Sequence, residues 1–199
     1  MATSKAQRVG IWVIAVAMTV GTVAGFVAMI LAPQNQASDQ ARAEEEYAKM
    51  MQEMQEEQSK QRQAASKPLE GYDAGRFDAG SVKDLKVKYL TRGNKSKVKT
   101  ADKISANYFG WTSDGKIFDS TNQDGTVTPA EFTVILPEDS PDGSGVIKGW
   151  VDGLVGVPVG STVELTIPGD MAYGNKDNGD GRPVGPLKFI VTIEKIVKE

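Results

Sequence analysis

Four stretches of the sequence alternate between apolar and polar side chains, and this alternation most constrains the fold. They cover residues 85–89, 104–108, 163–167 and 189–193. A period of two residues places the apolar side chains on one face of a β-strand. Strands of this kind usually form an antiparallel sheet that is covered on one face and wet on the other.

One segment in the last third of the chain offers a helix to cover the sheet. Its apolar residues follow helical spacing and stop before Gly156: they are Ile147, Trp150, Val151 and Leu154. A bent antiparallel sheet over one short helix belongs to the α+β class. The sequence therefore predicts one α+β domain, which we place at residues 83–199.

An uncharged stretch precedes this domain, at residues 9–32. A helix needs roughly 20 apolar residues to span a bilayer. Lys5 and Arg8 precede the stretch and acidic residues follow it, so the positive-inside rule places residues 1–8 in the cytoplasm and the domain outside the cell membrane. The alternative is a cleaved signal peptide, whose apolar core is shorter, about 7–15 residues. The sequence favours a retained single-pass anchor.

Residues 33–67 are polar and rich in strong helix formers, which predicts a helical spacer. A short apolar stripe, Ala43, Tyr47, Met50 and Met54, ends after two heptads, which is too short for a convincing coiled coil. Weak self-association through the anchor or the spacer remains an alternative, as does a scaffold role for this helix. Residues 68–82 form a connecting segment with several glycines.

The composition excludes several kinds of chemistry. The 199 residues include no Cys and no His, and the formal net charge is -3. Disulfides, thiol catalysis and His-based acid–base or metal sites are therefore not expected. Without a basic stripe, nucleic acid is not an expected partner. We expect no cofactor and no metal.

Aromatic residues flanked by turn glycines occur in three separate segments of the domain, at 108–120, 146–150 and 171–174. Rings in such a setting indicate an apolar pocket. In order, the segments contain Asp114-Gly115-Lys116-Ile117-Phe118-Asp119-Ser120, then Val146-Ile147-Lys148-Gly149-Trp150, then Ala172-Tyr173-Gly174, and Leu187-Lys188-Phe189 follows them. This ordered set resembles the FKBP-type peptidyl-prolyl cis–trans isomerases over residues 82–198.

The resemblance implies a half-barrel antiparallel sheet wrapped on the short helix, with a pocket that binds the proline of an X–Pro bond. Trp150 would form the pocket floor and Asp119 the acid beside it. The backbone N–H of Ile147 and the Tyr173 hydroxyl would donate to substrate carbonyls. The wall positions match Tyr108, Phe118, Val146, Ile147, Tyr173 and Phe189. The implied activity is isomerisation of X–Pro bonds in exported proteins, without covalent catalysis.

Three departures from the family pattern affect the predicted site. Asp124 stands where the family often has an arginine partner for the acid. Pro129 and Ala130 occupy a wall region that is commonly aromatic, so Phe132 is a less certain substrate-binding residue. The loop after Tyr173 is polar, and Val184 is its one predicted apolar contact. These departures leave open a membrane-tethered peptide-binding module or chaperone with little or no turnover.

Overall fold

The structure is a computed structural model that describes residues 36–140, 145–177, 179 and 181–197. Contacts divide the chain into two units, residues 1–53 and residues 54–199. The predicted anchor, residues 9–32, lies outside the described residues. Within the described ranges, no helix has both the length and the apolar character that a membrane crossing requires.

Helix α2, Gln36–Ala65, lies within the stretch predicted to be a helical spacer. Its composition explains the helix, because Ala, Glu, Gln, Lys and Met have high helical propensity. Tyr47 and Met50, from the predicted stripe, are exposed. The second unit begins at Met54 and therefore contains the last turns of α2.

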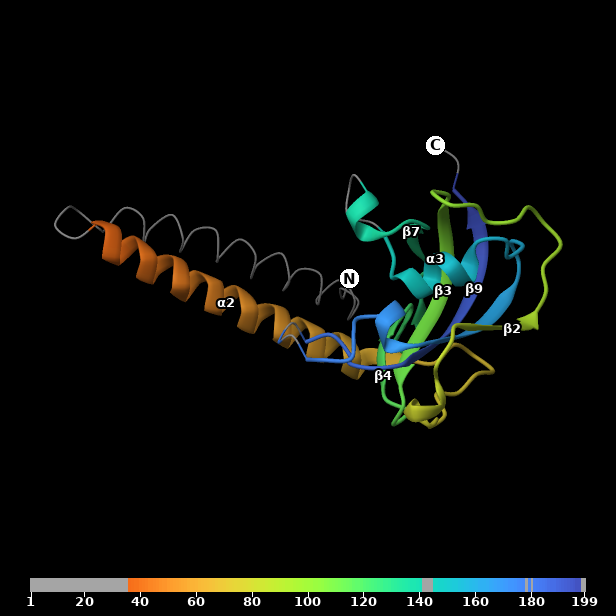
Figure 1. Cartoon of the computed structure of the whole chain (residues 1–199), viewed down its shortest axis with the longest axis horizontal. Helices are drawn as coiled ribbons and strands as arrows, with labels where there is room; N and C mark the ends of the chain where they lie inside the picture. Colours follow the sequence, from red (N-terminus) through yellow and green to blue (C-terminus); the bar gives the residue numbers. More distant parts are fainter. Residues whose placement is uncertain (1–35, 141–144, 178, 180, 198–199) are drawn as a thin grey trace, which may run out of the picture. The chain divides into compact units, whose positions relative to one another are not determined.

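The main sheet has six strands and every pairing in it is antiparallel (Figure 1). Its order is β2-β8-β9-β3-β4, and β7 pairs with the other half of the long strand β3. The strands are β2 (Lys86–Thr91), β3 (Lys103–Thr112), β4 (Ile117–Ser120), β7 (Ala130–Thr133), β8 (Thr162–Ile167) and β9 (Leu187–Ile196). The structure thus confirms the antiparallel sheet.

Helix α3, Lys148–Leu154, covers one face of this sheet (Figure 1). Four residues of the helix itself are buried: Gly149, Trp150, Gly153 and Leu154. The main core between helix and sheet contains the predicted apolar residues of three strands, among them Ile104, Leu165 and Val191. Burial of these side chains, worth about 25 cal/mol per Å² of apolar area, holds the two layers together.

The second face of the sheet is also covered, which corrects the prediction of one wet face. Leu69, Phe109, Trp111 and Ile190 form a second buried cluster, and Tyr72 and Phe77 of the connecting segment pack against it. The Trp111 indole donates to the carbonyl of Gly75 at 2.9 Å. Strands β3 and β9 carry apolar residues on both faces, so neither face can be left in water.

Strand β2 is the other exception to the predicted pattern. Val87 and Tyr89 were expected to face the core, but they are 37% and 36% exposed. Strand β2 lies at the edge of the sheet, with β8 as its one partner. Gly153 of helix α3, Lys148–Leu154, lies near Val87, since a Cβ at Gly153 would be 3.6 Å from Val87 Cγ2. With about two turns, the helix still leaves part of both side chains exposed.

A small second sheet joins the end of α2 to the domain. It has the order β1-β5-β6, with β1 (Ser66–Lys67), β5 (Asn122–Gln123) and β6 (Thr126–Val127). Strand β1 pairs antiparallel with β5, so the chain that leaves α2 runs beside the segment that follows β4. This pairing places the last turn of α2 close to the end of β4.

Candidate functional site

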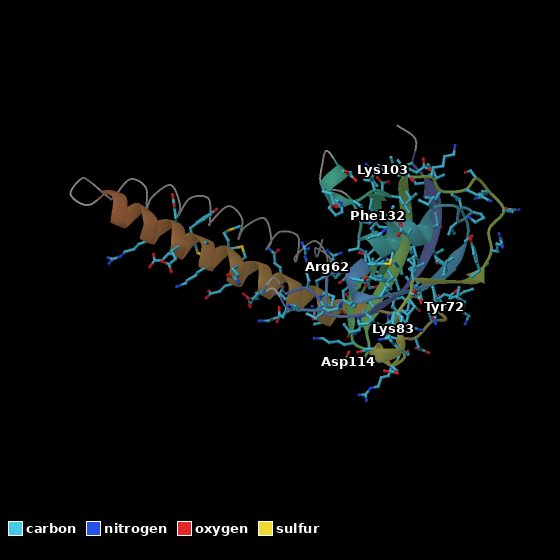
Figure 2. The ribbon with its side chains drawn as sticks, viewed as in Figure 1. Arg62, Tyr72, Lys83, Lys103, Asp114 and Phe132 are labelled. Carbon is cyan, nitrogen blue, oxygen red and sulfur yellow. The ribbon has the colours of Figure 1, made fainter. Side chains whose placement is uncertain are left out.

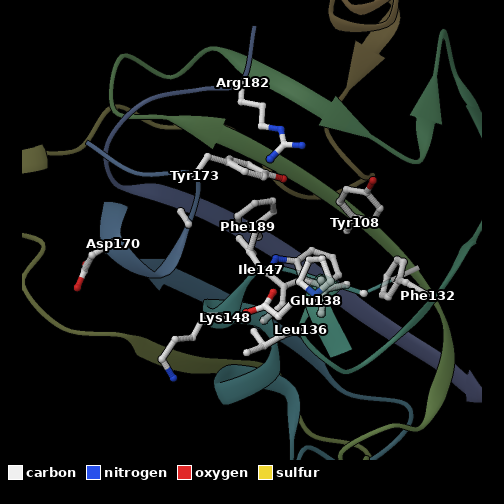
Figure 3. A pocket seen from close by; sticks show the side chains of 15 residues that line it. Tyr108, Phe132, Leu136, Glu138, Ile147, Lys148, Asp170, Tyr173, Arg182 and Phe189 are labelled. Atoms are coloured by element: carbon white, nitrogen blue, oxygen red, sulfur yellow. The ribbon is translucent and has the colours of Figure 1, made fainter. Parts of the chain in front are cut away.

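A cavity of about 720 Å³ is lined by residues of α3, β3 and β9 and of the loops beside them (Figure 3). Five of its lining residues are aromatic and come from segments far apart in the sequence: Tyr108, Phe132, Trp150, Tyr173 and Phe189. The aliphatic part of the lining includes Leu136, Val146, Ile147 and Ala172. The structure thus gathers most of the predicted pocket residues around one space.

Trp150 is at the centre of the aromatic group. Its ring centroid lies 5.2 Å from that of Tyr108, 5.0 Å from Phe132 and 5.3 Å from Phe189, each in an edge-to-face arrangement. Trp150 is 5% exposed. Edge-to-face contacts at these distances stabilise a fixed ring geometry, so the cavity has a stiff aromatic base. Phe132, a predicted substrate-binding residue, is part of it.

Gly110 on β3 makes room for two rings beside the cavity. A Cβ at this position would lie 2.6 Å from Phe189 Cδ1 and 2.8 Å from Phe118 Cζ, so a larger residue would displace both rings. Phe118 packs edge-on against Phe189 at 5.6 Å. Phe118 lines a neighbouring cavity of about 480 Å³, and it is not among the residues that line the aromatic cavity.

Asp119 lies behind Tyr108 rather than in the cavity lining. Its Oδ2 accepts the Tyr108 hydroxyl at 2.5 Å, and its Oδ1 accepts Arg62 Nε at 2.8 Å and the Ser120 N–H at 3.0 Å. Burial raises the pKa of Tyr108, and the charge of Asp119 and its hydrogen bond raise that pKa further. Tyr108 therefore stays protonated at neutral pH and holds the carboxylate.

Three hydrogen-bond donors at the cavity have no partner among the residues that the structure describes: the Ile147 N–H, the Tyr173 hydroxyl and the Trp150 indole N–H. Burial, and then the charge of Asp119, raise the pKa of Tyr173, while Arg182 opposes the shift. The phenol is therefore protonated at neutral pH and keeps its proton to donate. A substrate carbonyl would satisfy the Ile147 N–H or the Tyr173 hydroxyl.

Charged side chains border the cavity, and the sequence did not single them out. Glu138, Lys148, Asp170 and Arg182 belong to the lining. Arg182 Cζ lies 5.5 Å from the centre of the Tyr173 ring, while Lys148 and Asp170 point away from the ring cluster (Figure 3). Val184 is 43% exposed and is not part of the lining. Arg182 is in the polar loop that the sequence marked as a departure.

Arg62 is the partner of Asp119 that the family pattern did not supply. It belongs to the last turn of α2, 57 residues before Asp119 in the sequence. No signal in the sequence distinguishes it, because α2 contains many other charged residues. The pairing of β1 with β5 brings it to the end of β4.

The chain belongs to the FKBP-type peptidyl-prolyl cis–trans isomerase family, whose model matches residues 94–194. This is an enzyme family, and its antiparallel sheet with one helix fits the observed fold. The matched residues include the aromatic cavity, but they exclude α2 and Arg62.

Curated relatives agree with this assignment. The chain is 36% identical over 107 residues to the outer membrane protein MIP of Legionella longbeachae. This match covers 54% of this chain and 40% of that protein. The FKBP-type 22 kDa peptidyl-prolyl cis-trans isomerase of Escherichia coli (strain K12) is also 36% identical over 107 residues, covering 54% of this chain and 46% of that protein. FK506-binding protein 2 of Dictyostelium discoideum is 36% identical over 110 residues, or 55% of this chain and 75% of that protein. The matched region thus spans less than half the length of the first two relatives.

Proposed function

We propose that this protein is a peptidyl-prolyl cis–trans isomerase that acts on X–Pro bonds of exported proteins. One observation carries the proposal: the aromatic cavity around Trp150 is bordered by the Ile147 N–H and the Tyr173 hydroxyl, and neither donor has a partner in the part of the chain that the structure describes. The rings suit the apolar side of a proline, and the donors suit the carbonyls beside it.

The reaction requires no nucleophile. Rotation about an X–Pro bond is slow because twisting the amide destroys its resonance, a barrier of roughly 18–20 kcal/mol. A cavity walled by Tyr108, Trp150 and Phe189 removes water from the bond and favours the less polar, twisted amide. Donors that hold the neighbouring carbonyls keep the rest of the peptide in place while the bond turns. This mechanism suits a chain without Cys or His.

The location is a further part of the proposal. The uncharged stretch 9–32, preceded by Lys5 and Arg8, supports a single-pass anchor with its N-terminus in the cytoplasm. Uncatalysed proline isomerisation takes about 10–100 s at 25 °C. A catalyst held at the outer side of the cell membrane would shorten that step for proteins that emerge there.

The activity is tested by cis–trans exchange of an Ala–Pro peptide, measured by NMR with the full-length chain in detergent. We expect faster exchange with the wild type and with Val127→Ala, an exposed control outside the site. Trp150→Ala should lose most of the acceleration while its circular dichroism still shows a folded domain. Exchange no faster than that of the free peptide refutes the isomerase. Binding without turnover would instead support the tethered peptide-binding module.

The location is tested with single cysteines, since the chain has none of its own. A membrane-impermeant maleimide should label Thr128→Cys in intact cells and should leave Ser4→Cys unlabelled until the cells are lysed. Labelling of Ser4→Cys alone would reverse the proposed orientation. Recovery of the chain in the soluble fraction would contradict the anchor.

A further inference from the structure

The acid beside the cavity has a cationic partner from outside the family-matched region. Asp119 Oδ1 accepts Arg62 Nε at 2.8 Å, and Arg62 is on the last turn of α2 (Figure 2). The sequence contains no Lys or Arg between Lys116 and Lys148. The strands and turns that follow Asp119 therefore offer no cation of their own.

The end of α2 is fixed to the segment that follows Asp119. The Ser120 hydroxyl donates to the Lys67 carbonyl at 2.6 Å, and the Asn122 side chain donates to the Pro68 carbonyl at 2.7 Å. The Asp124 N–H donates to the carbonyl of Ala65, the last residue of α2, at 2.9 Å. These bonds hold the last turn of α2 in register with β4, so the pairing of Arg62 with Asp119 does not depend on the two side chains alone.

A continuous set of contacts leads from this ion pair to the cavity. The other carboxylate oxygen of Asp119 accepts the Tyr108 hydroxyl, and the Tyr108 ring packs edge-on against Trp150. Arg62 and Tyr108 thus bind opposite oxygens of one carboxylate. The charge of Arg62 also partly offsets the effect of Asp119 on the pKa of Tyr108.

We propose that Arg62 is a positioning residue for the isomerase reaction, which fixes the Asp119 carboxylate so that Tyr108 keeps its place in the cavity wall. This inference rests on the proposed function. The Arg62 side chain is 60% exposed and that of Asp119 27%. Ion pairs of such exposure contribute little to folding, so the role of Arg62 is in the geometry of the site. The last turn of α2 is therefore part of the active site.

The test compares Arg62→Gln, Arg62→Lys and the control Lys60→Ala in the full-length chain. Lys60 is on the same helix and pairs with Glu56 at 3.5 Å, so its removal deletes a matched charge and ion pair away from Asp119. We expect Arg62→Gln to lower kcat about threefold to fivefold with KM unchanged, the loss typical of such an ion pair. Arg62→Lys should recover part of the rate, because it restores the charge without the guanidinium.

Two further measurements separate positioning from a structural effect. The ring resonances of Tyr108 should shift in Arg62→Gln and stay in place in Lys60→Ala. Added salt of about 1 M, which screens exposed charges, should lower the rate of the wild type towards that of Arg62→Gln.

The possible failures are distinguishable. If the wild type does not accelerate exchange at all, the proposed function fails. If the wild type is active and Arg62→Gln matches Lys60→Ala in kcat, in salt response and in the Tyr108 resonances, the positioning role of Arg62 is refuted. A rise in KM alone would also overturn it, because that result assigns Arg62 to peptide binding.

Discussion

Replacing Gly149 with alanine should separate α3 from the sheet. A Cβ at this position would lie 2.8 Å from Ile167 Cδ1 on β8 and closer still to Cγ2. Ordinary contacts begin at 3.4 Å, so helix and strand must move apart by well over half an ångström. Helix α3 spans only Lys148–Leu154. The displacement at Gly149 therefore moves the whole helix, because no further helical turns are available to bend instead.

The expected magnitude follows from this clash. Overpacking of a core costs about 1–3 kcal/mol of the free energy of unfolding. The helical preference of alanine over glycine returns up to about 1 kcal/mol. Trp150 is the next residue, so the cavity is displaced with the helix. A displacement of about 1 Å at a reacting site can cost about a hundredfold in rate.

Gly153→Ala is the matched control on the same helix. Its Cβ would meet Leu165 Cδ2 at 3.0 Å, the far end of a flexible side chain that can turn aside. Urea unfolding should therefore place Gly149→Ala below Gly153→Ala in stability, and peptide exchange should show a large loss of activity for Gly149→Ala alone. Equal stability and equal activity of the two variants would refute the argument that close packing of α3 on β8 sets the cavity.

Three other changes test separate parts of the structure. The raised pKa of Tyr108 means that the folded state favours the protonated phenol, so the contribution of this phenol to stability is complete below its ordinary pKa of 10.0 and is lost as the pH rises above it. The wild type should therefore lose about 1.4 kcal/mol of unfolding free energy per pH unit above 10 relative to Tyr108→Phe. A constant difference between the two proteins in urea unfolding at several alkaline pH values would contradict this. Trp111→Phe loses the bond to Gly75 and part of a buried ring that stacks on Phe109. Together these losses should cost about 1–3 kcal/mol in urea unfolding and leave peptide exchange unchanged; a loss of activity would show that changes in the second cluster alter the cavity. Ser120→Ala removes a buried hydroxyl that donates to Lys67, which should cost about 1–3 kcal/mol, and an unchanged urea midpoint would mean that the end of α2 is held by other contacts.

The sequence could predict the strands and the helix because their apolar residues follow a simple period. Alternation at 104–108 and 163–167 places side chains on a face that the structure shows buried. The aromatic lining was predictable for a different reason, namely the resemblance to a family whose order of segments is preserved. Phe132 entered the prediction on weaker grounds, and the structure places it against Trp150.

What the sequence did not predict depends on contacts between distant segments. Trp111 donates to Gly75 in the connecting segment, and that segment has no periodic signal in the sequence. Val87 and Tyr89 have the pattern of a buried face, yet both stay partly exposed on the edge strand β2. Arg62 pairs with Asp119 only because β1 and β5 meet, and a residue pair so far apart leaves no local pattern.

The proline of a substrate should lie in the cavity around Trp150. The most direct measurement is a set of intermolecular NOEs between an Ala–Pro peptide and the full-length chain with isotope-labelled aromatic rings. We expect NOEs from the proline ring protons to Trp150, Tyr108 and Phe189, and we expect these NOEs to be lost in Gly149→Ala. Faster exchange with NOEs only to Phe118 or Pro183, which line the neighbouring cavity, would contradict it.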